Sequence, residues 1–318
     1  MIRVFPAAVL AALLLAAPAS AEPRLTVGKP RLRAALHCSG RLHSAAKRPI
    51  MLVTGTGSSG DEFHVFEKGA VDAHGAPVCW VNFPRATTAD VQVSVQYLVY
   101  GLRVMARRAD RTVAVFGISQ GGLLPRIALT YWPSLRRKVS DVVAVAGTQH
   151  GTSAFKASGC RPQGCAPAVW QQVRGSHFLR ALNRKGRDET PGRRTPWTTV
   201  RSSTDEVVQP QTGRHPTSAL RGAGNVLIQS VCPGRRVSHI GSAVDSVTWA
   251  ALLDALRHKG PARASRLPHD VCAHPYGPGL DEAQTTAFVA AGPGLAASHI
   301  ATQPRTPREP RVRAWARR

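Results

Sequence analysis

The chain has 318 residues, a formal net charge of +24 and a hydrophobic fraction of 43%. A chain of this length can bury one large core or two small ones. Its basic residues are scattered, and aromatic residues make up only 6%, so a stacking platform for nucleic acid is excluded and no nucleic-acid partner is expected. The charge predicts only peripheral contact with anionic lipid or cell-wall surfaces.

Residues 1–21 have the pattern of a secretory signal peptide. Arg3 supplies a positive charge, residues 4–17 form a short apolar core, and residues 19–21 fit a small-residue cleavage site. No later segment approaches 18 apolar residues, so no transmembrane segment is expected. The mature chain is therefore predicted to be secreted, that is, extracellular.

An even number of cysteines in an exported chain predicts disulfides, although six cysteines allow fifteen pairings. The six are Cys38, Cys79, Cys160, Cys165, Cys232 and Cys272. Cys160 with Cys165 would close a small local loop, and the other four would link distant segments. No pair has the Cys-x-x-Cys spacing of a zinc site, and residues 61–67 read as a solvated helix face. No metal and no organic cofactor is expected.

The first half of the chain alternates strand and helix patterns after an irregular segment, 22–46. Strands are predicted at 49–53, 76–83, 113–118 and 142–146, and helices at 61–72, 90–107 and 121–131, the second of them capped by Thr88 or Asp90. The strands are continuously apolar, which is typical of a mostly parallel sheet covered by helices on both faces. The predicted fold class is therefore α/β.

Beyond residue 150 the pattern is looser. Residues 151–167 are rich in Gly and Pro, 183–196 form a polar loop, strands are expected at 197–201 and 225–231, and helices at 242–256 and 281–291. The basic tail, 305–318, is expected to be disordered. This pattern predicts one catalytic domain over residues 22–300, followed by a disordered segment, 301–318.

The stretch "FGISQGG" (116–122) follows a predicted strand and places Ser119 between two glycines. In Gly-x-Ser-x-Gly, a tight strand-to-helix turn exposes the serine hydroxyl at the edge of the sheet. Thr56 follows the first predicted strand, so it is expected at the same edge as Ser119. Both residues are candidates for one catalytic site.

A serine nucleophile needs a base within hydrogen-bond reach and an acid that orients the base. In the chain order Ser–acid–His, Asp205 is the favoured acid, with Glu206 as its alternative. His239 is the favoured base because it lies between a predicted strand and a predicted helix. Its main competitors are His269 and His274. The other histidines that follow the acid are His215, His258 and His299.

The same chemistry needs donors for an oxyanion. The backbone N–H of Gln120 lies at a predicted helix N-terminus, where free amides favour negative charge. Thr56, in the stretch "GTGSSG" (55–60), offers a backbone N–H and a hydroxyl. That stretch lacks the lysine of a phosphate-binding loop and the glycine spacing of a dinucleotide site.

Several segments together resemble the family of secreted α/β-hydrolase lipases typified by Candida antarctica lipase B and its bacterial relatives. They are "KRPIMLVTGTGSSG" (47–60), "GISQGGLLPRIALTYWPSLRRKV" (117–139), "AVWQQ" (168–172), "STDEVVQPQ" (203–211) and "SVCPGRRVSHIGS" (230–242). The resemblance implies an α/β-hydrolase fold, with Ser119 as nucleophile, Asp205 as acid, His239 as base, and Thr56 and Gln120 as the oxyanion hole. It also implies disulfides Cys38–Cys79 and Cys232–Cys272, and makes 151–167 a lid or rim segment.

The leading hypothesis is a secreted serine esterase or lipase that hydrolyses carboxylic esters such as acylglycerols, of the triacylglycerol lipase type. Its expected substrate is a lipid or another ester, and a monomer is expected. The alternatives are a phospholipase, a polyester hydrolase of the cutinase type, and a catalytically inactive hydrolase-fold protein that binds polyanions.

Overall fold

The computed structural model describes residues 22–317, so the signal-peptide prediction lies outside the described residues. Within them, the sheet has seven strands in the order β1-β3-β2-β4-β5-β6-β7. The strands are β1 (Leu36–Ser39), β2 (Ile50–Val53), β3 (Val78–Val81), β4 (Val113–Ile118), β5 (Val139–Val145), β6 (Trp197–Arg201) and β7 (Gly224–Leu227). Only the β1–β3 pair among them is antiparallel. The predicted mostly parallel sheet is confirmed.

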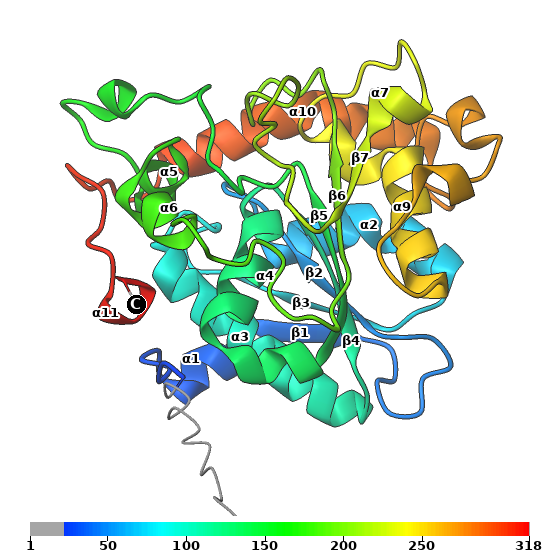
Figure 1. Ribbon diagram of the computed structural model, residues 1–318, viewed down its shortest axis with the longest axis horizontal. Helices are drawn as coiled ribbons and strands as arrows, with labels where there is room; N and C mark the ends of the chain where they lie inside the picture. The colour runs from blue at the N-terminus through cyan, green and yellow to red at the C-terminus, as the bar shows by residue number, and fades with distance from the viewer. Residues whose placement is uncertain (1–21, 318) are drawn as a thin grey trace, which may run out of the picture.

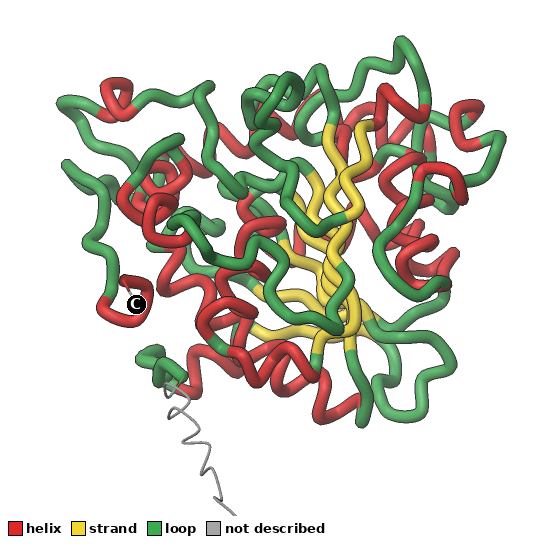
Figure 2. Tube along the Cα trace, viewed as in Figure 1, coloured by secondary structure: helices red, strands yellow, loops and turns green. Residues whose placement is uncertain are grey.

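Helices cover both faces of this sheet (Figures 1 and 2). One face packs against α1 (Lys29–Ala34), α3 (Val91–Ala109), α4 (Gln120–Tyr131) and α6 (His177–Leu182). The other packs against α2 (Gly60–His74), α8 (Gly241–Val244) and α9 (Ser246–Arg257). In β4, Val113 and Val115 face the first layer, whereas Ala114 and Phe116 face the second. Because both of their faces are buried, the central strands β2 and β4 are apolar at every position.

The edge strand β1 is an element that the sequence reading missed, because 22–46 was expected to be irregular. Its four residues are all half-buried and show no apolar alternation. Cys38 lies directly opposite Cys79 in the antiparallel register, and the two form a disulfide. This covalent link holds a short strand that lacks strong strand-forming residues at the edge of the sheet.

The α2 segment corrects the expectation of a solvated helix face at 61–67. Phe63 and Glu67 are buried, and Phe63 stacks on Phe116 of β4 with ring centroids 6.2 Å apart. Burial raises the pKa of the Glu67 carboxyl well above its ordinary value, although a hydrogen bond from Trp249 opposes this shift. The charged residues at the start of the segment suggested exposure to solvent, but one face of the helix packs on the sheet.

The helix expected at 281–291 ends ten residues later than expected: α10 spans Glu282–Ala301 and continues through Pro293. Small residues explain why this stretch can pack closely on its neighbours. A Cβ on Gly292 would lie 2.7 Å from Cδ1 of Ile240, and one on Gly57 would lie 2.7 Å from the carbonyl oxygen of Ala296. Gly292 therefore allows a close approach to Ile240, Gly57 allows one between its own loop and α10, and the Gly-Pro-Gly sequence does not end the helix.

Residues 301–317 are packed on the domain, which corrects the expectation of a disordered tail. The carboxylate of Glu309 accepts two backbone N–H groups at the start of α6, each at 2.8 Å. Trp315, in α11 (Ala314–Arg317), meets Tyr131 edge to face with centroids 4.8 Å apart. A capping carboxylate and an aromatic anchor thus hold a segment whose basic, proline-containing composition indicated disorder.

Smaller differences concern the second half of the chain. The strand expected at 225–231 ends at Leu227 and is followed by the short helix α7 (Ile228–Val231). The helix expected at 242–256 is divided into α8 and α9, and α5 (Pro167–Gln172) and α6 were not predicted. Between residues 22 and 317, no helix combines the length and apolar character that crossing a membrane requires.

Candidate active site

Ser119 lies in the tight turn between β4 and α4. Its φ is 57°, in the left-handed region that residues other than glycine rarely adopt. The neighbouring glycines are sterically required: a Cβ on Gly117 would lie 2.1 Å from the carbonyl oxygen of Gly121, and one on Gly121 would lie 2.0 Å from that of Val53. The glycines therefore allow this strained turn, which puts Ser119 at the carboxyl end of the sheet.

Asp205 and His239 form a buried pair after β6 and β7. His239 Nδ1 lies 2.9 Å from Oδ2 of Asp205, whose other carboxylate oxygen accepts the backbone N–H groups of Val207 at 2.9 Å and Val208 at 2.8 Å. Because a carboxylate can only accept, Nδ1 carries the proton and Nε2 keeps the lone pair of a base. This is the tautomer that a general base for serine requires.

The competing residues occupy other positions. Glu206 accepts the backbone N–H of His239 at 3.0 Å and does not contact its imidazole. His258 pairs with Asp254 at 2.9 Å at the end of α9. The ring of His274 is exposed. The acid beside the buried imidazole is therefore Asp205.

Two cavities meet at Ser119 and His239. The larger, about 450 Å³, extends between β5, α5 and α10 and is lined by Thr148, Val208 and Ile300 among others. The smaller, about 150 Å³, lies between α2, α8 and α10 and is lined by Phe63, Ile118 and Leu295 among others. Ester substrates have two parts, and each cavity can receive one of them.

A polar network borders the larger cavity. Thr56 Oγ1 donates to Oε1 of Gln120 at 2.6 Å, and Nε2 of Gln172 donates to Thr56 Oγ1 at 2.8 Å and to Gln120 Oε1 at 3.0 Å. The hydroxyl of Thr148 donates to Oε1 of Gln172 at 2.9 Å, which orients the Gln172 amide. The candidate residues Thr56 and Gln120 are thus in direct contact, whereas Gln172 and Thr148 were not named as candidate site residues.

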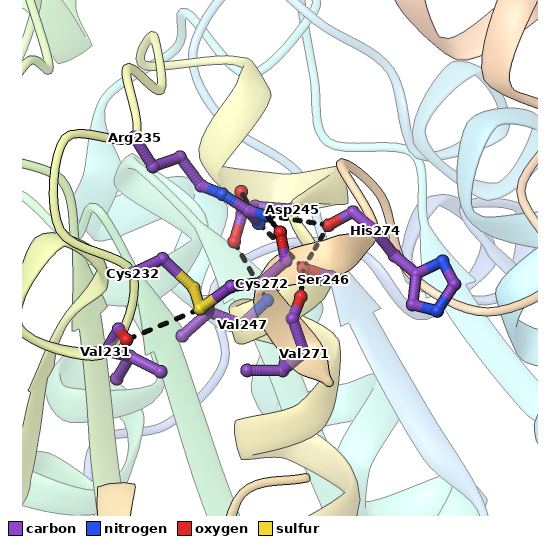
Figure 3. Close-up of a disulfide and its surroundings, with 9 residues drawn as sticks. All are labelled: Val231, Cys232, Arg235, Asp245, Ser246, Val247, Val271, Cys272 and His274. Carbon is purple, nitrogen blue, oxygen red and sulfur yellow. Dashed lines mark hydrogen bonds and ion pairs between the residues drawn. A yellow bond between two sulfur atoms is a disulfide. The ribbon is translucent and has the colours of Figure 1, made fainter. Parts of the chain in front are cut away.

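The loop that carries His239 is fastened at its start by the Cys232–Cys272 disulfide (Figure 3). Arg235, beside it, donates to the carbonyl oxygens of Cys272 at 2.7 Å and His274 at 2.9 Å. Arg235 also pairs with the buried carboxylate of Asp245 at 3.2 Å. These contacts link the residues before His239 to the segment after α9. The other two disulfides, Cys38–Cys79 and Cys160–Cys165, lie in the β1–β3 pair and the 151–167 segment.

The 151–167 segment borders the mouth of the larger cavity. Thr152 and the exposed Phe155 line that cavity, and the backbone N–H of Thr152 donates to the carbonyl oxygen of Gln172 at 2.9 Å. Among residues 22–317, no group of three or more His, Cys, Asp or Glu side chains is arranged to hold a metal ion. The described site offers serine, imidazole, carboxylate and backbone N–H chemistry.

A buried polar network that begins at Arg126 in α4 contacts the loop after β5. Arg126 is fully buried and donates to Oδ1 of Asn183 at 2.6 Å and to the carbonyl oxygen of Gln149 at 3.3 Å. Burial lowers the pKa of Arg126 to about 10. Burial tends to raise the pKa of Glu189, but the imidazole of His150, 3.6 Å from its carboxylate, and the backbone N–H of Arg221, which donates at 2.7 Å, outweigh it, and the pKa of Glu189 falls to about 2.

The Glu189→Gln variant is expected to lose about 1–2 kcal/mol of unfolding free energy at neutral pH, after discounting the pKa shift for solvent screening. Because the folded pKa of Glu189 is below the ordinary 4.5, its contribution is present above pH 4.5 and is lost as the pH falls toward 2. Denaturant unfolding of both proteins from about pH 6 to about pH 2.5 tests this. A difference between the two proteins that stays constant over this range contradicts it.

The chain is similar in sequence and structure to known fungal lipases. Lipase B of Pseudozyma antarctica is 33% identical over 262 residues, which are 78% of this chain and 73% of that protein. The crystal structure of Aspergillus fumigatus lipase B superposes with a TM-score of 0.84 at 31% identity, covering 94% of this chain and 74% of that one. The propeptide form of a Bacillus licheniformis lipase gives 0.57 at 16% identity, covering 72% and 54%, which supports the fold alone. No family model matches the chain.

The fungal similarity covers most of both proteins at an identity that establishes common descent, and it agrees with the sheet order and the helix layers described above. The chain therefore belongs to the lipase B family of carboxylic ester hydrolases, with the α/β-hydrolase fold.

Proposed function

We propose that this protein is a secreted serine lipase or esterase that cleaves acylglycerols and related carboxylic esters through an acyl-enzyme intermediate. Ser119 is the nucleophile, His239 the general base and acid, and Asp205 the residue that orients and stabilises the imidazole. The backbone N–H groups of Gln120 and Thr56 stabilise the oxyanion, and the Thr56 hydroxyl joins them by turning away from Oε1 of Gln120, which keeps the Nε2 donor of Gln172. The observation that carries the proposal is the buried 2.9 Å contact between Asp205 and His239 at the same cavities as Ser119.

In this mechanism, Oγ of Ser119 attacks the ester carbonyl carbon while Nε2 of His239 takes the hydroxyl proton. The negative charge on the carbonyl oxygen is stabilised by the Gln120 N–H, at the first position of α4, where helix amides have no intrahelical acceptor. The C–O bond then breaks, and the imidazolium gives its proton to the departing alcohol. Water, deprotonated by His239, attacks the carbonyl carbon of the acyl-enzyme. The bond from this carbon to Oγ of Ser119 then breaks, the imidazolium returns its proton to Oγ, and the acid leaves.

The sizes of the two cavities favour an ester with unequal parts. The larger cavity suits the acyl chain, and the smaller one, beside Ile118, suits the alcohol. The apolar side chains that line both cavities favour hydrocarbon, which supports a lipid ester. The residue types of the 151–167 segment are consistent with a rim over the acyl cavity.

The remaining proposals concern the chain as a whole. The three disulfides support an extracellular protein and thus the signal peptide at 1–21. With the signal peptide removed, the catalytic domain begins at residue 22. A monomeric enzyme is proposed because the proposed catalytic groups all come from one chain. The net charge of +24 supports peripheral attraction to anionic lipid or cell-wall surfaces.

A fluorophosphonate probe tests the reaction type. The probe is expected to add one covalent label, located on Ser119 by peptide mass spectrometry, and to abolish ester hydrolysis. Short- and long-chain esters, a triglyceride emulsion, phospholipid and a polyester film then define the substrate. Faster turnover of phospholipid or polyester than of acylglycerol would favour those alternatives, and an unlabelled protein that binds polyanions would favour the inactive binding protein.

The oxyanion role of the Thr56 hydroxyl has its own test. The Thr56→Val variant keeps the shape and the backbone N–H, and it is expected to lower kcat by about 100-fold with little change in KM, because the lost donor acts mainly in the transition state. The matched control is Thr248→Val in α9, whose buried hydroxyl has no hydrogen-bond partner. Equal kcat in wild type and Thr56→Val would remove the hydroxyl from the mechanism.

A further inference from the structure

The smaller cavity contains two polar side chains that the proposed mechanism does not use. Glu62, in the first turn of α2, and His299, near the end of α10, both line this cavity together with Ser119. Their facing atoms, Oε1 of Glu62 and Nε2 of His299, are 3.8 Å apart. This distance exceeds the usual N–H···O range of about 2.7–3.2 Å, so the two atoms do not satisfy each other.

The remaining polar atoms of both side chains are already occupied. Nδ1 of His299 lies 2.9 Å from the carbonyl oxygen of Gly57, which can only accept, so Nδ1 carries the proton. Oε2 of Glu62 accepts the backbone N–H of Ser59 at 2.7 Å and the hydroxyl of Ser58 at 3.2 Å, as part of the helix cap. When the imidazole is neutral, Oε1 of Glu62 and Nε2 of His299 are therefore two neighbouring acceptors that a ligand in the cavity can use.

Two adjacent acceptors match two adjacent hydroxyl donors. The hydroxyls on neighbouring carbons of a polyol lie close enough for one to donate to Glu62 while the other donates to His299. The rest of the cavity wall is largely apolar, with Phe63, Ile118 and Ile240 available to cover the carbon skeleton. In an apolar cavity, a small number of polar groups is enough to orient a ligand.

We propose that Glu62 and His299 recognise a vicinal diol in the alcohol part of the ester, so that 1-monoacylglycerols are preferred over simple alkyl esters. This rests on the proposed function, because it assigns the smaller cavity to the alcohol. The volume of about 150 Å³ accommodates a three-carbon polyol.

The test compares esters of one acid on the wild-type enzyme. They are 1-monobutyrin, 2,3-dimethoxypropyl butyrate and n-propyl butyrate, all below their solubility limits. The dimethoxy ester has the same chain and similar electron withdrawal but no hydroxyl donors. We expect kcat/KM for monobutyrin to exceed that for the dimethoxy ester by at least about tenfold, the effect of one hydrogen bond to a charged acceptor.

Two variants then assign the preference to the two side chains. In Glu62→Gln, the amide oxygen can keep capping Ser59 while its NH₂ turns to the cavity, where it can donate to a hydroxyl or an ether oxygen alike but can no longer accept a hydroxyl proton. In His299→Asn, the side-chain NH₂ can keep the bond to Gly57, while the shorter side chain has no acceptor at the position of Nε2. Each variant is expected to lower the monobutyrin-to-dimethoxy ratio by about five- to tenfold. Asp72→Asn, an acid-to-amide change at an exposed position of α2, is the control and leaves the ratio unchanged.

The outcomes separate this inference from the function on which it rests. A wild-type ratio near one, with steady turnover of propyl butyrate, overturns the diol preference and leaves the esterase proposal standing. A high wild-type ratio that both folded variants retain overturns the assignment to Glu62 and His299. Absence of turnover of every ester, together with absence of fluorophosphonate labelling, overturns both proposals.

Discussion

Replacing Ser119 with alanine is expected to lower kcat for butyrate esters by about 10⁵- to 10⁶-fold, because no acyl-enzyme can form without the hydroxyl. The residual rate comes from the oxyanion donors and substrate binding, which the substitution leaves in place. Alanine and serine differ by one oxygen atom, so the turn at φ 57° retains the same backbone strain. Purified variant and wild type are compared by initial rates, with mass spectrometry excluding contamination by wild-type protein.

The control for Ser119→Ala is Ser94→Ala. The hydroxyl of Ser94 is buried in α3 and has no hydrogen-bond partner, so its removal should leave kcat at the wild-type value. The two variants delete the same atom from the same residue type. Wild-type turnover by Ser119→Ala would overturn the proposed mechanism, whereas comparable losses in both variants would indicate general damage to the fold.

The proposed triad could be predicted because its signals are local and ordered along the chain. Gly117 and Gly121 are needed at fixed distances from Ser119, so the turn is visible in the sequence. Asp205 and Glu206 were harder to separate, because adjacent carboxylates give the same pattern. Only the fold distinguishes them: one contacts the imidazole of His239 and the other its backbone N–H.

The parts of the site that escaped prediction depend on packing between distant segments. Gln172 belongs to the short helix α5 and reaches Thr56, 116 residues away; the stretch "AVWQQ" that contains it contributed to the family resemblance but did not indicate this contact. The predicted helix at 281–291 stopped before Gly-Pro-Gly because this sequence normally ends a helix, whereas α10 continues through it. Here the lost side-chain volume allows Gly292 to pack against Ile240 beside the smaller cavity, which sequence periodicity cannot reveal.

The tail shows the same limit. Composition predicted disorder for residues 301–318, since basic residues and prolines disfavour a core. Specific contacts override composition: the Nε1–H of Trp170 donates to the carbonyl oxygen of Thr306 at 2.9 Å, and the Tyr131 hydroxyl donates to that of Ala316 at 3.1 Å. Each contact needs a partner that is more than 130 residues away.

Removing the Cys232–Cys272 disulfide is expected to produce the largest loss of stability among these predictions. The two cysteines are 40 residues apart, and in the chain-entropy model closing such a loop stabilises the folded state by about 4 kcal/mol. The variant Cys232→Ala/Cys272→Ala should therefore lose about that much free energy of unfolding, measured by denaturant titration under oxidising conditions. Because the bond begins the loop that carries His239, ester hydrolysis should also fail at a lower temperature than in wild type.

The matched control is Cys160→Ala/Cys165→Ala, in which the cysteines are five residues apart. The same model gives about 2 kcal/mol for this short loop, because the entropy of the unfolded chain depends on the logarithm of loop length. Cys160 and Cys165 line neither of the two cavities, whereas Cys232 begins the loop that carries His239, so the temperature at which hydrolysis fails should change less. If the short-loop variant loses as much free energy as the long-loop variant, loop entropy does not explain the contribution of Cys232–Cys272, and native contacts such as those of Arg235 must account for it.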